Sequence, residues 1–504
     1  MIARRNVITL MVAIVVGACS PRDRRTPDDT LVVLIEAAMT SSDPRYAISN
    51  YDSKLSKLVH AGLTAVDTDS MLPRLELAAK VERAGDRMWD VELRPDARFS
   101  DGTAVTGEDV AFTYESMLAE DSDSLFHRGF TERFTKVEAL GPQRVRFHLR
   151  EPLATFESDI DFGIISRTGK GAGPYVVREL TTSHAVLDIN PHYVGEKPKV
   201  PHVEIKFVRD ASARLLMLVG GSADLIQNAV RLDLVEEVKD RPRVAITSAP
   251  SVILTYLMLN NADPLLKDVR VRQAIALSLD RPAIIAAKFG GRARLASGLM
   301  AETHWSYEPD VPHWTRDLPR ARKLLDEAGL VDPDGPGPRP RARFVYKTSS
   351  DAFRVTIARV IAAQLAEVGL EVEVRSFEFA TFFADVKKGT YQIASMQTGE
   401  VSDPDFYFTY YHSSRIPDAT NPDGGNRWRY KNARVDELTL AGRHELDRAR
   451  RKALYAEVQR LVATEVPTVP LWHEDNVVLT HVDVQGYAIT PNARLIGLRK
   501  AWKR

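Results

Sequence analysis

Residues 88–115 contain the pattern that most restricts how this chain can fold. Apolar and charged side chains alternate over Trp89–Arg94, which predicts a half-buried β-strand. The Asp101-Gly102 dipeptide that follows predicts a tight turn. Thr106 stands three residues before Asp109, the spacing of a capping box, and the apolar residues after it predict a helix. The segment therefore predicts a strand, a turn and a capped helix, a unit that occurs in many folds.

A run of alternating helices and strands is predicted in the C-terminal half of the chain. Apolar residues recur at helical spacing over Phe353–Val368, and Leu370–Val374 follows as a predicted strand. Ala380–Lys388 and Tyr391–Met396 repeat this order of helix and strand. Such an alternation predicts an α/β lobe. Three aspartates are expected to cap further helices: Asp210, Asp280 and Asp317.

The composition indicates an ordinary globular protein. Its 504 residues are enough for two or three domains with a large core. Hydrophobic residues make up 44% and charged residues 27%, and 68 basic residues balance 68 acidic ones. Because there is no basic patch, we expect no nucleic-acid partner. The chain has one cysteine, so the core rather than disulfides must stabilise it.

The N-terminal segment has the pattern of a bacterial lipoprotein signal peptide. Arg4 and Arg5 form a positive region, and Val7–Val16 is an apolar stretch too short to span a membrane. The stretch ends beside Cys19 in a sequence that resembles a lipobox, and this cysteine is the only one in the chain. An ordinary signal peptide with an incidental cysteine is the alternative. We predict cleavage before Cys19 and lipidation of its thiol.

This anchor predicts where the mature protein is found. Residues 1–18 would be the signal peptide, and residues 19–29 a polar tether with no means of packing. Two or more acyl chains on Cys19 would hold the protein stably in a lipid bilayer. We therefore expect a membrane-anchored lipoprotein of the cell envelope, on its periplasmic or extracytoplasmic face.

Four blocks of the sequence together resemble one protein family. The first is residues 88–115, and the second is Leu257–Ile284, which ends in KDVRVRQAIALSLDRPAI. The third is Gly389–Asp405 (GTYQIASMQTGEVSDPD), and a Gly-x-Gly-Pro-Tyr block lies at Gly171–Tyr175. Their order and spacing resemble those of the family 5 extracellular solute-binding proteins, the dipeptide, oligopeptide and nickel receptors of ABC importers. The resemblance covers nearly the whole mature chain.

The resemblance implies an α/β, bilobal fold of the type 2 periplasmic-binding-protein class. Two discontinuous lobes would close over a ligand held between them. Lobe I would comprise residues 30–256 and 475–504, and lobe II residues 257–474. A subdomain inserted in lobe I would span about residues 53–165. It is shorter than in relatives, which leaves open how much of the pocket wall it supplies.

The resemblance further implies a lipid-anchored substrate-binding receptor of an ABC importer. Such a receptor captures a peptide, here through its free amine, and delivers it to the ABC permease and ATPase complex in the inner membrane. We expect it to act as a monomer without a cofactor. A metal chelate such as nickel, an oligosaccharide or another amine is the alternative ligand, because a fold does not identify a ligand.

Glu400 is the most informative single position in the resemblance. In dipeptide-binding relatives an aspartate three residues before an Asp-Pro pair holds the α-ammonium of the ligand. Glu400 occupies that position ahead of Asp403-Pro404. A carboxylate that faces a binding site needs a cationic partner, and the N-terminus of a peptide is one. The alternative is a solvated loop carboxylate.

Three further residues complete the expected ligand-binding set: Asp403, Lys347 and Tyr407. Relatives pair the carboxylate of the ligand with an arginine ahead of the helix at Phe353–Val368. Here that stretch offers Lys347, a point charge without the bidentate fork of arginine. Tyr407 would line an apolar part of the site or, alternatively, pack in the core.

Catalysis is the rival hypothesis, and the motifs argue against it. The chain contains no H-E-x-x-H and no G-x-S-x-G motif. His444-Glu445 lacks the second histidine of a zinc site, and Gly163…Gly169-Lys170 is one residue too long for a phosphate-binding loop. Since the histidines are scattered, we expect no metal site and no catalytic residues.

Overall fold

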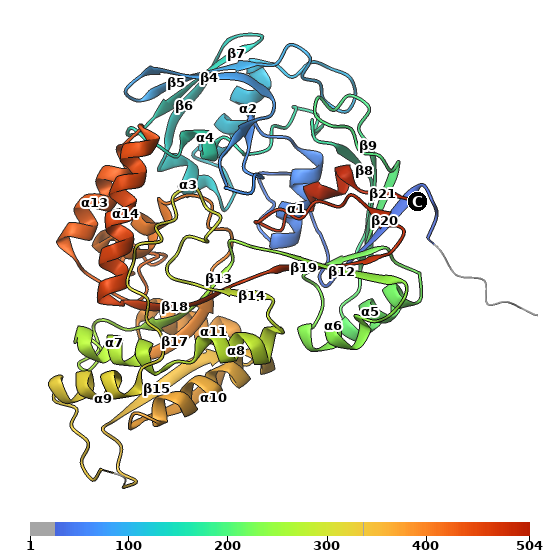
Figure 1. Cartoon of the computed structure of the whole chain (residues 1–504). Helices are drawn as coiled ribbons and strands as arrows, with labels where there is room; N and C mark the ends of the chain where they lie inside the picture. The colour runs from blue at the N-terminus through green and yellow to red at the C-terminus, as the bar shows by residue number, and fades with distance from the viewer. Residues whose placement is uncertain (1–25, 336) are drawn as a thin grey trace, which may run out of the picture.

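The computed structural model describes residues 26–335 and 337–504. Figure 1 shows two α/β lobes, with a smaller sheet attached to the upper one. The predicted signal peptide, Cys19 and most of the predicted tether lie outside the described residues. No helix in the described part of the chain is both long and apolar enough to cross a membrane.

Lobe I is built on a seven-stranded sheet. Its strands, in order across the sheet, are β12 (Val244–Ala249), β19 (Asn476–His481), β11 (Leu225–Gln227), β1 (Thr30–Ile35), β10 (His202–Phe207), β9 (His184–Ile189) and β8 (Tyr175–Leu180). Its helices are α1 (Asn50–Val59), α5 (Ala211–Val219) and α6 (Leu232–Val238). Leu31, Val33 and Ile35 pack toward α1, and Val32 and Leu34 pack toward α5 and α6. Both faces of β1 are therefore buried, as its unbroken apolar sequence predicts.

The smaller sheet lies within the range predicted for the inserted subdomain, and we call this part of the chain the subdomain. Its strands, in order, are β4 (Ala78–Gly85), β5 (Met88–Leu93), β7 (Arg144–Leu149) and β6 (Phe134–Gly141), beside the pair β2 (Thr64–Ala65) and β3 (Arg74–Leu75). Its helices are α2 (Gly107–Leu118), α3 (His127–Thr131) and α4 (Phe156–Asp159). The predicted strand and helix are β5 and α2, and Thr106 and Asp109 form the predicted capping box. Tyr114 of α2 packs edge-on against Phe147 in the subdomain core, with ring centroids 4.9 Å apart.

Helix α1 belongs to the core of the seven-stranded sheet. The subdomain is predicted to begin near residue 53, which lies inside this helix. Leu55 and Leu58 of α1 pack with the apolar side chains of β1, whereas the core of the subdomain begins with Ala61. The amphipathic pattern of a helix identifies its apolar side but not which of two neighbouring cores covers that side.

Lobe II contains a six-stranded sheet with helices on both faces. Its strands, in order, are β14 (Ala293–Leu295), β18 (Thr468–Glu474), β13 (Leu254–Leu259), β17 (Ile393–Gln397), β15 (Ala342–Ser349) and β16 (Leu370–Phe377). One face carries α7 (Val269–Ser278), α8 (Arg281–Phe289), α9 (Leu318–Glu327) and α10 (Ala352–Ala366). The other carries α11 (Phe379–Lys388), α12 (Phe406–Tyr411), α13 (Ala433–His444) and α14 (Arg448–Glu465). Side chains of β13 alternate between these faces, with Leu257 toward α7 and Tyr256 toward α14.

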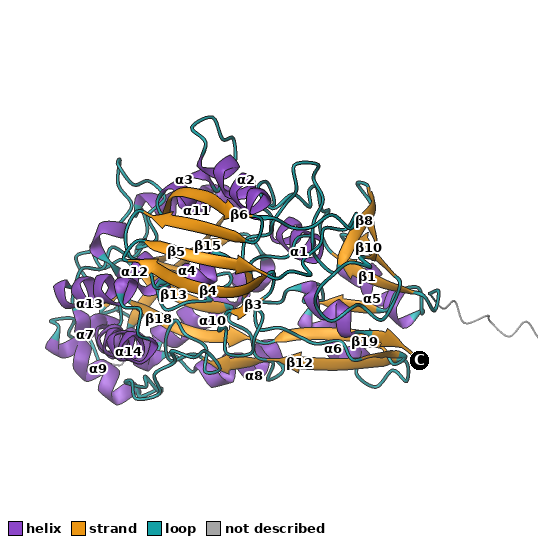
Figure 2. Ribbon diagram, turned by 90° about the horizontal axis from the view of Figure 1, so that it is seen from above, coloured by secondary structure: helices purple, strands orange, loops and turns teal. Residues whose placement is uncertain are grey.

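Two short segments connect the lobes. Residues 250–253 lead from β12 to β13, and Asp475 alone separates β18 from β19, which continue each other from lobe II into lobe I (Figure 1). The expected limit after residue 256 lies inside β13, because Leu254–Leu259 pairs along its length with β17 and β18 of lobe II. Seen from above, β12 and β19 lie side by side at the opposite end of the molecule from α13 and α14 (Figure 2).

The C-terminal segment returns to lobe I. It contains the short strands β20 (Val484–Gln485) and β21 (Trp502–Lys503), which pair with each other, and a 3₁₀ helix at Leu495–Lys500. Leu495 and Leu498 of that helix pack in the same core as α1. The loop that precedes the helix contacts both the subdomain and the connection between the lobes, since Asn492 donates to the carbonyl of Val66 and the carbonyl of Pro491 accepts from the amide of Val252.

Candidate functional site

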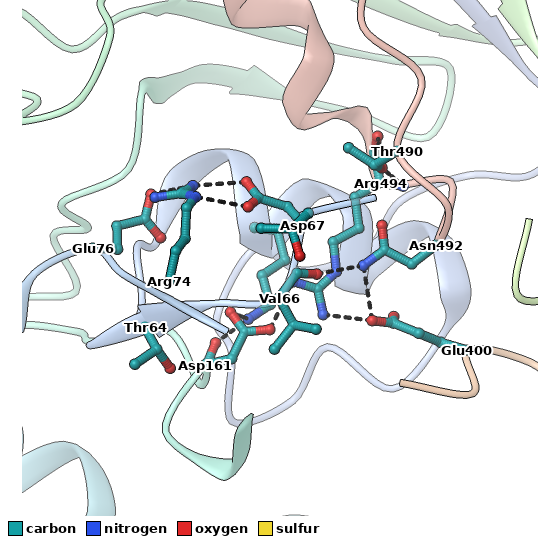
Figure 3. A network of polar contacts seen from close by, with 12 residues as sticks. Thr64, Val66, Asp67, Arg74, Glu76, Asp161, Glu400, Thr490, Asn492 and Arg494 are labelled. Atoms are coloured by element: carbon teal, nitrogen blue, oxygen red, sulfur yellow. Dashed lines mark hydrogen bonds and ion pairs between the residues drawn. The ribbon is translucent and has the colours of Figure 1, made fainter. Parts of the chain in front are cut away.

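Glu400 lies where the two lobes meet. It follows β17, whose carboxyl end lies beside the start of β13 and so faces lobe I. Ligands of open α/β sheets bind beyond the carboxyl ends of the strands. Glu400 Oε1 accepts hydrogen bonds from Asn492 Nδ2 and Arg494 Nη2, both at 2.9 Å (Figure 3). Both donors belong to lobe I, and we call this contact of three residues the lobe junction.

Arg494 connects the lobe junction to the interior of lobe I. Its Nη1 donates to Asp161 Oδ2 at 2.7 Å, and Lys57 Nζ donates to Asp161 Oδ1 at 2.8 Å. Burial alone lowers the pKa of Arg494, but attraction to Asp161 and Glu400 outweighs burial and raises this pKa. The guanidinium therefore stays charged and bridges a carboxylate of each lobe.

A second ion pair in Figure 3 fixes the loop beside the lobe junction. Arg74 pairs with Asp67 through two bonds, Nε to Oδ1 and Nη2 to Oδ2, both of 2.7 Å. Arg499 Nη2, from the C-terminal segment, lies 3.6 Å from Asp67 Oδ2. The same loop carries Val66, whose carbonyl accepts a hydrogen bond from Asn492 at 2.7 Å. Asn492 thus donates one hydrogen bond within lobe I, to Val66, and one to lobe II, to Glu400.

A cavity of about 350 Å³ lies beside the connection between the lobes. This volume is within the range of small-ligand sites. Ala301 of its wall packs against Val66, Met71 and Val252, and the carbonyl of Val66 accepts a hydrogen bond from Asn492 of the lobe junction. The wall consists of Pro250, Ser251, Arg294, Leu295, Ala296, Ser297, Met300, Ala301, Glu302, Thr303, Tyr307, His313 and His473. Burial lowers the pKa of His473 to about 4, which keeps its ring uncharged at neutral pH.

Asp403 follows Glu400 closely in the sequence but has a buried partner in lobe II. Its exposure is 7%, and Arg451 of α14 binds it through Nη1 to Oδ2 at 2.9 Å and Nη2 to Oδ1 at 2.5 Å. The backbone amide of Asp405 donates to Oδ1 at 2.8 Å. Both carboxylate oxygens are engaged within lobe II, and the contact of Asp403 with a ligand stays a prediction.

Lys347 and Tyr407 also have partners within lobe II. Lys347 Nζ donates to Asp385 Oδ2 at 2.7 Å and to the carbonyl of Thr390 at 2.6 Å. Tyr407 is 1% exposed, and its hydroxyl accepts from the amide of Leu299 at 3.2 Å. Within the described residues, Glu400 is the one member of the predicted set that hydrogen-bonds to lobe I. Ligand contacts of Lys347 and Tyr407 stay predictions.

Arg354 is a candidate ligand-binding residue that sequence reasoning missed. It lies in the first turn of α10, with its Nη1 3.4 Å from Glu474 Oε1 and 3.5 Å from Thr255 Oγ1. Gln397 Nε2, at the carboxyl end of β17, also lies 3.5 Å from Thr255 Oγ1. Arg354 therefore presents a bidentate cation near the connection between the lobes. The sequence signal that could have identified it is an arginine three residues after the helix cap Asp351, in a helix that directly follows a strand in the sequence.

These groups are suited to binding a charged ligand. Glu400 and Arg354 place opposite charges on lobe II, at the ends of β17 and β15. Charge-assisted hydrogen bonds to such groups are about twice as strong as neutral ones. Within residues 26–335 and 337–504, no group of three or more His, Cys, Asp or Glu side chains is arranged to hold a metal ion.

The sequence has recognisable relatives. A family model described as bacterial extracellular solute-binding proteins, family 5 middle, matches residues 73–418. The probable D,D-dipeptide-binding periplasmic protein DdpA of Escherichia coli is 26% identical, over 92% of this chain and 92% of that protein. The probable di/tripeptide-binding protein 5 of Pseudomonas aeruginosa is 28% identical, over 83% of this chain and 84% of that protein.

Solved structures share the fold. NikZ from Campylobacter jejuni, in complex with Ni(L-His), has a TM-score of 0.78 at 22% identity and covers 95% of this chain and 100% of its own. The oligopeptide-binding protein AppA from Bacillus subtilis, in complex with a nonapeptide, has a TM-score of 0.75 at 24% identity, with coverages of 94% and 99%. The predicted bilobal α/β fold is confirmed. The prediction that the chain is not an enzyme is also confirmed, since its relatives are binding proteins. The chain belongs to the family 5 bacterial extracellular solute-binding proteins.

Proposed function

We propose that this protein captures a peptide between its lobes and delivers it to the permease and ATPase complex of an ABC importer. The observation that carries the proposal is Glu400 at the lobe junction, at the carboxyl end of β17. With Arg354 on the same lobe, it offers partners for the ammonium and the carboxylate of a peptide. The names of relatives, which include dipeptide- and di/tripeptide-binding proteins, support this ligand class.

A metal chelate is the second candidate ligand. The structural neighbour NikZ was solved with Ni(L-His), and NikA from Brucella suis with Fe(III)-EDTA. The carboxylates of a chelate would pair with a cation such as Arg354. The ammonium of a peptide needs Glu400 instead. Both candidates would therefore use Arg354, and only the peptide depends on Glu400 as well.

A ligand panel tests the proposed function. We expect dipeptides and tripeptides, at about 100 times their Kd, to stabilise the mature protein by about 2.7 kcal/mol, which appears as a rise in Tm. Ni(L-His) and oligosaccharides serve as the comparison. Small-angle scattering with a stabilising peptide should show compaction, because the lobes close around a ligand. Stabilisation by the chelate alone would favour the second candidate, and stabilisation by none of the panel would contradict both.

We further infer that the mature protein is a monomer anchored in the membrane through lipid on Cys19. The support is the sequence pattern of a positive region, an apolar stretch and a sole cysteine at the expected cleavage site. Diacylglycerol on the thiol and an acyl chain on the amine give the two or more chains that stable anchoring needs.

Cys19→Ser should abolish lipidation. We expect the unmodified sequence to partition into the detergent phase of a Triton X-114 extract, and the variant to remain unprocessed or to move to the aqueous phase. Ser20→Ala, one residue further along, should behave like the unmodified sequence. If Cys19→Ser matures and stays with the membrane as before, the anchor is not at this residue.

A further inference from the structure

Lys54 is a buried cation close to the lobe junction. It lies in α1 with 7% of its surface exposed. Its Nζ lies 5.2 Å from the centroid of the Tyr51 ring, and it forms no ion pair or hydrogen bond with any residue that the structure describes. Burial disfavours the charged ammonium, and the Tyr51 ring and the attraction of more distant carboxylates offset that cost only in part.

Lys57, less than one turn further along α1, is a lysine with a partner. Its Nζ donates to Asp161 Oδ1 at 2.8 Å, and Asp161 Oδ2 also accepts a hydrogen bond from Arg494. Burial lowers the pKa of both lysines. The two side chains share one helix and differ in whether the protein itself supplies the anion.

Two carboxylates lie close enough to Lys54 to attract its charge. Burial lowers its pKa, and attraction to Glu36 and Glu400 raises it in part. Glu36 follows β1 of lobe I, and Glu400 follows β17 of lobe II. Each carboxylate forms an ion pair with an arginine. Glu36 Oε2 lies 3.8 Å from Arg214 Nη2, and Glu400 Oε1 lies 2.9 Å from Arg494 Nη2. Lys54 is therefore near the carboxyl ends of one strand from each lobe, where ligands of such sheets bind.

An ammonium bound at Glu400 would add a positive charge beside three cations that already lie near the lobe junction, Lys54, Lys57 and Arg494. A carboxylate on the same ligand would cancel the added charge. Repulsion between like charges therefore favours a ligand that brings an anion together with its amine.

We propose that Lys54 binds a carboxylate of the ligand, so that the receptor selects peptides with an anionic group close to their free amine. The inference rests on the proposed function for the peptide itself. Two sources of the carboxylate have the same chemistry: an acidic side chain on the first residue, or the C-terminus of a very short peptide, which would then bind Lys54 in place of Arg354. Either would give Lys54 the charge-assisted hydrogen bond that it lacks in the described structure.

Binding measurements distinguish the two sources. By calorimetry on the mature chain, we compare the tripeptides Glu-Ala-Ala and Gln-Ala-Ala, and the dipeptide Ala-Ala with its C-terminal amide. In the pair whose carboxylate binds Lys54, the acidic peptide should bind at least about 10-fold more tightly than its neutral counterpart. A preference within the first pair assigns the acidic side chain, and one within the second pair assigns the C-terminus. Lys54→Met should abolish this preference, and Lys54→Arg should retain it.

A measurement without ligand separates this inference from the proposed function. Lys54→Met should raise the Tm of the free protein by about 1–3 °C, because it removes a buried charge that has no partner. Lys57→Met is the matched variant and should lower the Tm, because Asp161 loses a partner. If no peptide binds, the proposed function fails, and a higher Tm of Lys54→Met would then point to an anionic ligand of another class. A fall in Tm for Lys54→Met, or an acid preference that survives it, would overturn the inference.

Discussion

Replacing Arg451 by methionine should lower the free energy of unfolding by about 3–5 kcal/mol, because it leaves the Asp403 carboxylate buried without its cation. Arg451 is 4% exposed and Asp403 7%, and two hydrogen bonds join the guanidinium to the carboxylate. Burial alone lowers the pKa of Arg451, but attraction to Asp403 outweighs it and raises this pKa. The pair also attaches α14 to the loop that carries Glu400. Urea unfolding followed by circular dichroism measures the loss.

Arg450→Met is the matched control for this prediction. Arg450 precedes Arg451 in α14, but its side chain is 74% exposed and pairs with Glu445 at the surface. Its replacement should cost less than about 1 kcal/mol. The double variant Arg451→Met/Asp403→Asn should recover a large part of the stability, because asparagine leaves no buried charge. Equal losses of stability in Arg451→Met and Arg450→Met would mean that the buried pair contributes no more than a surface pair.

Glu400→Gln should weaken the binding of a peptide with a free amine by about 10- to 100-fold, because it removes the charge and keeps the shape. Asn492 and Arg494 both donate to Oε1, and the side chain remains 33% exposed, so Oε2 is left for an ammonium. Arg494 keeps its bond to Asp161 in the variant, so we expect lobe I to stay intact. Calorimetry with the peptide of highest affinity measures the change.

Acetylation of the peptide provides the complementary experiment. It should weaken binding to the unmodified protein by a similar factor and add little to the effect of Glu400→Gln, because both changes remove the same ion pair. Glu371→Gln is the control, since Glu371 is 57% exposed on β16 and pairs with Arg343. If acetylated and free peptides bind the unmodified protein equally, the amine is not recognised at Glu400.

Local structure was predictable because its signals lie within a few residues. The side chains of Thr106, Asp210, Asp280 and Asp317 all accept a backbone amide at the start of a helix, as expected from their positions. The alternation that predicts β5 places Val91 and Leu93 in the core of the subdomain. The bilobal fold was predictable for a different reason, since the resemblance rested on ordered blocks along the whole chain.

The site was less predictable because its contacts join distant segments. Glu400 and Arg494 are 94 residues apart, and no local pattern near either one indicates the other. Lys347 lies in β15, and nothing in the residues around it indicates that Asp385 of α11 binds its ammonium. Arg354 could have been identified only from its position in the first turn of a helix directly after a strand.

The position of β19 determines the order in which the two lobes can be completed. In the sheet of lobe I, β19 lies between β12 and β11, although the whole of lobe II separates it from them in the sequence. Lobe II runs without interruption from β13 to β18, so it can fold as soon as it has been synthesised or exported. The seven-stranded sheet stays open between β11 and β12 until residues 476–481 arrive. Lobe I is therefore finished last, and a chain that stops before β19 would carry a complete lobe II on an incomplete lobe I.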